Sequence, residues 1–75
     1  MALTRKQEFL VEYELLSDTI EWLIVAVRLP DGKVELITNQ YRNIAEKVQY
    51  YSMAYNDDLV LNTNINIRIV NWMFA

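Results

Sequence analysis

The stretch Glu21–Leu36, EWLIVAVRLPDGKVEL, limits the possible folds of this chain more than any other segment. Its centre, Pro30-Asp31-Gly32, places Pro at the first corner of a type I turn, Asp at the second and Gly at the left-handed position that follows. Residues that favour strands lie on both sides of this turn. The segment therefore predicts a β-hairpin with a glycine bulge, flanked by strands over roughly 21–29 and 33–38.

The turn also predicts which residues of the two strands share a face of the sheet. If Leu29 lies opposite Lys33, the other residues pair in antiparallel order, and paired residues lie on the same face. The first face then carries Trp22, Ile24, Ala26, Val34 and Leu36. The second face carries Leu23, Val25, Val27, Leu29 and Ile37, interrupted by Lys33 and Glu35.

One helix can cover only one of these two apolar faces. We expect it on the first face, because that face is more uniformly apolar across both strands. The second face would then stay open, and an uncovered apolar patch with a polar rim is typical of an interface. The alternative is that the N-terminal residues or the tail Trp72-Met73-Phe74 fold over it. The predicted protein interface consists of Leu23, Val25, Val27, Leu29 and Ile37.

Residues 4–16 are compatible with either a strand or a helix. Apolar and mainly acidic residues alternate in EFLVEYEL, and this period of two is typical of a half-buried strand. Thr4 and Gln7 instead resemble a capping box at the start of a helix. In a helix, however, Val11 and Leu15 would face solvent with nothing to cover them. We therefore favour the strand.

As a strand, this segment would begin a row of carboxylates that we call the acidic ladder. Alternate residues of a strand lie about 7 Å apart, which is of the same order as the spacing of phosphates along a nucleic-acid strand. This spacing suggests a protein that mimics nucleic acid and occupies a basic channel in another protein. The acidic ladder consists of Glu8, Glu12, Glu14, Asp18 and Glu21.

Downstream of the hairpin, the apolar period changes to that of an amphipathic helix. Either Asn39 or Asn43 is expected to cap the start of this helix, since Asn side chains accept hydrogen bonds from the first turn. The turn-favouring run Asn56-Asp57-Asp58 is expected to end it. The predicted apolar stripe consists of Tyr41, Ile44, Val48, Tyr51 and Tyr55.

The tail LVLNTNINIRIVNWMFA returns to a period of two and predicts a fourth strand, with isoleucines on one face and asparagines on the other. The order is then β-β-β-α-β. The predicted fold class is α+β, with a four-stranded, mainly antiparallel sheet and one amphipathic helix packed on one face. Residues 1–75 are expected to form one small domain.

Composition excludes several classes of function. The chain has no Cys and no His, so neither disulfides, the usual zinc ligands nor a Ser-His or Cys-His pair can form. A single Gly excludes glycine-rich phosphate loops. We therefore expect no catalytic, cofactor-binding or metal-binding residues, and no enzyme. The net charge of −3 disfavours direct nucleic-acid binding. The longest apolar run is too short for a membrane span, and the N-terminus lacks a signal-peptide core, so we expect a cytoplasmic protein.

These observations favour a non-enzymatic protein–protein interaction module, which either self-associates as a homodimer or inhibits a larger host protein. In size, acidity and order of elements, the chain resembles the small, catalytically empty inhibitors of phages, including some anti-CRISPR proteins. That resemblance implies a viral anti-defence role and transfers no residue. The acidic nucleic-acid mimic is one alternative, and a structural accessory subunit is another.

Overall fold

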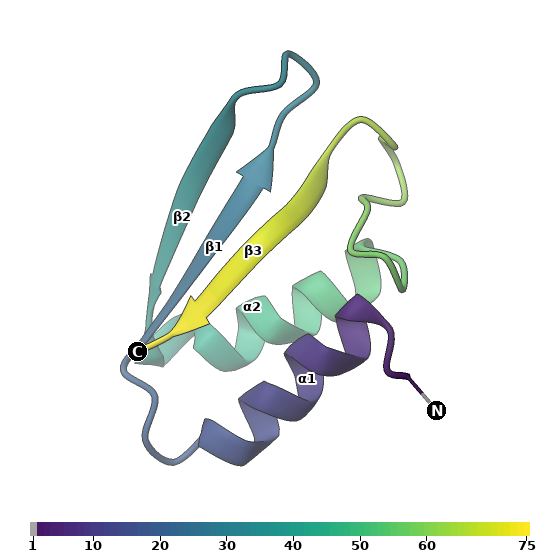
Figure 1. Cartoon of the computed structure of the whole chain (residues 1–75). Helices are drawn as coiled ribbons and strands as arrows, with labels where there is room; N and C mark the ends of the chain where they lie inside the picture. Colours follow the sequence, from purple (N-terminus) through teal and green to yellow (C-terminus); the bar gives the residue numbers. More distant parts are fainter. Residues whose placement is uncertain (1) are drawn as a thin grey trace.

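The computed structural model describes residues 2–75 as an α+β fold, in which a three-stranded antiparallel sheet carries two helices on one face (Figure 1). The strand order in the sheet is β2-β1-β3, so β1 is central and the other two strands form the edges. The elements are α1 (Arg5–Leu16), β1 (Trp22–Arg28), β2 (Val34–Gln40), α2 (Tyr41–Ala54) and β3 (Arg68–Phe74).

The predicted hairpin is confirmed, including its register. Gly32 has a φ of 88°, and its N–H donates to the carbonyl of Leu29 at 2.9 Å, which closes the turn. The N–H of Leu29 donates to the carbonyl of Lys33 at 2.8 Å, and the N–H of Lys33 donates to Asp31 Oδ1 at 2.9 Å. Val25 consequently lies opposite Ile37, as the turn predicts.

The strand predicted for residues 4–16 is wrong, because these residues form helix α1. Both halves of the capping box are present: Thr4 Oγ1 accepts from the N–H of Gln7, and Gln7 Oε1 accepts from the N–H of Thr4. The helix leaves Val11 42% and Leu15 80% exposed. It forms nevertheless, because a helix satisfies its own backbone groups and the capped segment delivers Phe9 to the core with only 1% of its surface exposed.

The helices cover the second hairpin face, so the prediction that they cover the first face is wrong. Leu23 and Val25 are fully buried and Val27 is 4% exposed. The hairpin alone does not determine which of its two faces the helices cover, because both are apolar. Strand β3 determines it. It adds Ile69, Trp72 and Phe74 to the second face, but mainly Asn71 and Met73 to the first.

The alternative that N-terminal residues fold over the second face is confirmed for α1, whereas the tail Trp72-Met73-Phe74 lies beside β1 in strand β3 and does not cover that face. The ring of Phe9 on α1 stacks on Phe74 at 5.4 Å between centroids and meets Trp72 edge-on at the same distance. Together with α2, these side chains form one continuous core. Its fully or nearly buried members are Phe9, Leu23, Val25, Val27, Ile44, Val48, Tyr51, Tyr55, Leu59 and Ile69.

Helix α2 confirms the predicted stripe, although its ends differ from the prediction. Tyr41 is 65% exposed and does not belong to the core. The N-cap residue is Gln40 without a side-chain cap, so the prediction of an Asn39 or Asn43 cap is wrong. At the other end, Lys6 Nζ of α1 donates to the carbonyls of Ser52 and Tyr55 at 2.9 and 3.0 Å, which satisfies carbonyls that a helix end leaves unpaired.

The tail strand begins later than its alternating sequence predicts. Residues 56–67 form turns, because asparagine side chains hydrogen-bond the backbone nearby. Asn56 Oδ1 accepts from the N–H groups of Asp58 and Val60, and Asn64 Oδ1 accepts from that of Asn66. The tail strand still forms as β3, and because residues 4–16 form α1 instead of a strand, the sheet of the described residues has three strands and the four-stranded prediction is wrong.

Candidate protein-binding surface

The face of the sheet opposite the helices is apolar and exposed; we call it the open face. It is the first hairpin face, extended by β3. Leu36 is 67%, Val34 55% and Met73 53% exposed, whereas Ile24 and Ala26 are half-buried. Figure 1 shows both helices on the opposite side of the sheet. The apolar residues of the open face are Trp22, Ile24, Ala26, Val34, Leu36 and Met73.

The open face is hollowed at its centre. Ala26, the smallest apolar residue of β1, lies between larger side chains of all three strands and leaves a depression of about 290 Å³. Because its exposed lining is mainly apolar, the depression suits an apolar anchor of a partner better than a charged ligand. The lining residues are Ile24, Ala26, Leu36, Asn71, Trp72 and Met73.

Polar residues border the open face at both ends. Arg28 and Arg68 lie opposite each other at the hairpin end of β1 and β3, where two cations meet on one face of an acidic protein. Thr38 and Gln40 pair with Ile24 and Trp22 on β2 and therefore share this face. An apolar centre with a polar, partly charged rim is the usual anatomy of a protein interface.

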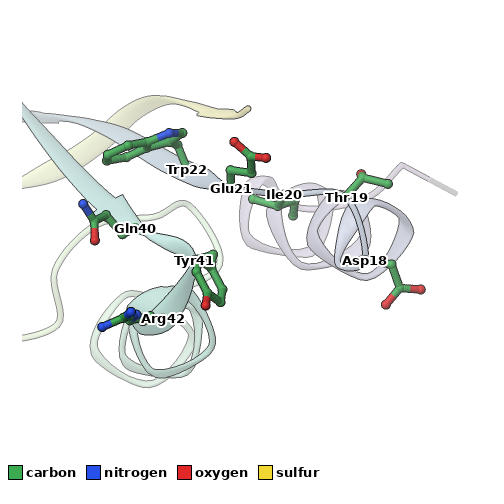
Figure 2. A pocket seen from close by; sticks show the side chains of 8 residues that line it. All are labelled: Asp18, Thr19, Ile20, Glu21, Trp22, Gln40, Tyr41 and Arg42. Carbon is green, nitrogen blue, oxygen red and sulfur yellow. The ribbon is translucent and has the colours of Figure 1, made fainter.

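A second concavity, of about 640 Å³, lies where β1 and α2 begin. Figure 2 shows its charged side chains, Asp18, Glu21 and Arg42, pointing away from one another rather than toward a common point. They form no acid–base pair across the cavity, and the remaining lining is Tyr41, Trp22 and short polar or aliphatic side chains. This arrangement provides no nucleophile with an adjacent base.

The structure buries most of the predicted interface. Leu23, Val25 and Val27 lie beneath the helices, so the prediction that they form an open surface is wrong. Leu29 is half-buried against the core, and Ile37, on the edge strand β2, is 36% exposed. Only Ile37 is therefore available to a partner at the sheet edge.

The acidic ladder does not exist as a row at strand spacing, since its first three members lie on helix α1. Glu8 and Glu12 are one turn apart on one side, and Glu14 points to another. Glu8 pairs with Arg5 at 3.4 Å, and Glu12 accepts a 2.8 Å hydrogen bond from Trp72 Nε1. Asp18 and Glu21 lie beyond the helix, exposed beside the second concavity.

Titratable groups with shifted pKa values belong to the core rather than to a reactive site. Burial raises the pKa of Tyr51 above its ordinary value; the Asn39 amide offsets part of this rise and Tyr50 adds to it. Burial, with the nearby Tyr50 and Tyr51, also raises the pKa of Tyr55. Asn39 is 7% exposed, and within residues 2–75 its Nδ2 has no acceptor in hydrogen-bonding geometry. Both phenols therefore remain protonated and neutral around neutral pH.

Neither metal ligands nor a membrane-spanning helix are found in the described part of the chain. Across residues 2–75, no three His, Cys, Asp or Glu side chains gather in a way that would hold a metal ion. No helix in that range has the length and apolar character needed to cross a membrane. The fold thus defines an α+β domain with one helix-covered and one open sheet face. Comparisons with protein-family models, curated protein sequences and solved structures found no match to the chain.

Proposed function

We propose that this protein is a non-enzymatic protein–protein interaction module that binds its partner through the open face. The observation that carries the proposal is the continuity of exposed apolar side chains across all three strands, from Val34 and Leu36 to Met73. Surfaces of this kind mark interaction sites in soluble proteins.

The size of the open face supports the proposal. Leu36, Val34, Met73 and Trp22 together expose on the order of 400 Å², within the range of the largest patches found on monomeric proteins. Burial of this area against a partner would contribute about 10 kcal/mol before the entropic costs of association are subtracted. Because association itself costs several kcal/mol, a specific complex also needs the polar rim to pair.

The rim indicates the chemistry of the partner. Arg28 and Arg68 lie next to each other at one end of the open face, so a partner with carboxylates beside an apolar ridge would complement it. The partner surface would place its apolar ridge in the depression around Ala26 and its acidic groups at the two guanidinium groups. If the contact covers a functional surface of the partner, binding would regulate or inhibit the partner.

Two matched methionine variants test the proposal. Met73 on the open face is 53% exposed and Met53 on α2 is 72% exposed, so lysine at either position leaves the core intact. The partner is first isolated from the native host with the wild-type chain, and each affinity is then measured with purified components. We expect Met73→Lys to weaken binding at least tenfold and Met53→Lys to leave it unchanged. Equal affinities for both variants would refute the role of the open face.

A further inference from the structure

The free edge of β2 is a second interaction surface, distinct from the open face. β2 is an edge strand, and six of its seven residues are exposed, with only Asn39 buried. In Figure 1 no described element lies beyond β2 on its outer side. The strand contains no Pro, Gly or Lys, the residues that commonly blunt an edge.

The hairpin register shows which backbone groups are unpaired on this edge. Since Leu29 N–H donates to Lys33, the main-chain groups of Glu35, Ile37 and Asn39 point toward β1 in the alternating antiparallel pattern. Those of Val34, Leu36 and Thr38 therefore point outward. They form a regular row of donors and acceptors that is ready to pair with another strand.

The opposite edge of the sheet, formed by β3, is protected against pairing with a further strand. This contrast singles out the edge of β2 as the one available for pairing. β3 contains an irregularity in its pairing between Ala26 and Val27 of β1, and such bulges disrupt further pairing. Arg5 of α1 reaches this edge, where Nη2 donates to the carbonyl of Val70 at 3.3 Å and the guanidinium lies 4.6 Å from the Trp72 ring centre. The edge of β3 is thus blunted twice, whereas β2 carries only the single charge of Glu35.

We propose that β2 pairs antiparallel with β2 of a second copy of this chain, around a two-fold axis at Ile37. The two sheets then join into one continuous sheet, with the helices of both copies on the same side. Leu36 lies opposite Thr38 of the second copy, and Val34 lies opposite Gln40 of the second copy. The outward backbone groups of one strand, including those of Gln40, meet those of the other in about eight hydrogen bonds, two for each of the four hydrogen-bonded pairs.

Charge and overlap favour this register. The axis at Ile37 is the centre of Val34–Gln40, so all residues of the strand pair. Glu35 then faces Asn39 of the second copy, whereas an axis at Glu35 would set two carboxylates against each other. The half-exposed Ile37 side chain meets its own symmetry mate, which removes apolar surface that the helices leave open.

The area of such a contact predicts its strength. A single strand-to-strand contact buries less than the roughly 1,200 Å² of stable interfaces, so the dimer should dissociate reversibly at about micromolar concentration. Dimerisation places Leu36 of each copy opposite Thr38 of the other, so that the two Leu36 side chains lie diagonally across the junction. The open faces of the two copies therefore adjoin on one side of the joined sheet, with Thr38 and Gln40 of both copies interleaved along the junction.

Single cysteine variants test both the contact and its register, because the chain has no native Cys. In the proposed dimer, Ile37 and its symmetry mate form a non-hydrogen-bonded pair with Cα atoms about 4.5 Å apart, within the range for a disulfide. Thr38 and its symmetry mate are offset by two residues and lie about 8 Å apart, beyond that range. We expect Ile37→Cys to give a covalent dimer on mild oxidation and Thr38→Cys to remain mostly monomeric. Equal cross-linking of the two variants, or none, would overturn the proposal.

A proline variant separates the edge from the open face. Thr38→Pro removes an outward N–H and leaves the pairing with β1 intact, so sedimentation equilibrium should show at least a tenfold weaker dimer. Met73→Lys should leave cross-linking of Ile37→Cys unchanged. If Met73→Lys loses partner binding but the wild-type chain shows no dimer, the proposed function is supported and the edge contact is rejected. Binding of another protein's strand to β2, with no self-association, would also reject it.

Discussion

The packing of Phe9 gives the strongest test of the fold. Its side chain is 1% exposed and lies against Trp72, Phe74 and Tyr51, with ring centroids 5.4, 5.4 and 6.1 Å away. Truncation of a buried Phe to Ala costs about 3–5 kcal/mol, because the transfer energy of the ring is lost and a cavity remains. The aromatic contacts place Phe9→Ala in the upper half of that range.

That loss is large for a chain of 75 residues, whose total stability is expected to be about 4–11 kcal/mol. Phe9→Ala should therefore leave the chain close to complete unfolding. The milder Phe9→Leu should lower the free energy of unfolding by about 1–1.5 kcal/mol, so its stability can still be compared with that of the wild type. With a urea m-value of about 1 kcal/mol/M, the midpoint for Phe9→Leu falls by about 1 M.

Urea unfolding followed by circular dichroism measures both variants against a control on the same helix. Val11 is 42% exposed on α1, and Val11→Ala should change stability by less than about 0.5 kcal/mol. If Phe9→Ala and Val11→Ala differ by less than about 1 kcal/mol, the packing of α1 on the sheet is refuted. The prediction of a strand over residues 4–16 would then regain support, since a strand places Phe9 and Val11 on the same face.

Three further predictions concern single features of the structure. Lys6→Met removes two hydrogen bonds to the end of α2 and should lower stability by about 1–2 kcal/mol, measured by urea unfolding; an unchanged midpoint would contradict the capping role. Gly32→Ala should lower the free energy of unfolding by about 1 kcal/mol, because alanine is strained at a φ of 88°. An added Cβ meets nothing within 4 Å, so a much larger loss of stability in thermal unfolding would contradict the open space around Gly32. Burial raises the pKa of Tyr51 above its ordinary value of 10.0, so stability should fall as pH rises past about 10, where only the unfolded state releases the proton. Tyr51→Phe should flatten this alkaline decline, and an identical slope would refute it.

Local signals in the sequence predict the hairpin and α2 well. The turn Pro30-Asp31-Gly32 uses residues whose backbone preferences suit each corner, and the hydrogen bond between Leu29 and Lys33 then determines the register of the whole pair. The stripe of α2 repeats over four turns, which is enough to identify a helix and its buried side. Both predictions depend only on residues close together in the chain.

Residues 4–16 show where local patterns conflict. Alternation favours a strand, and the Thr4–Gln7 capping box favours a helix. A strand needs a neighbour to satisfy its backbone, whereas a capped helix satisfies most of its own groups. In residues 2–75, β3 occupies the remaining place beside β1, so the helix forms and Val11, Leu15 and Leu16 stay exposed.

The sequence by itself determined that the hairpin has two apolar faces and which residues belong to each. Only the tertiary structure decided which face became the core. That choice depends on β3, about forty residues further along the chain, whose Ile69, Trp72 and Phe74 join the second face. Because burial depends on the summed apolar surface of all strands and helices, the face that is more uniform in the hairpin alone became the open one.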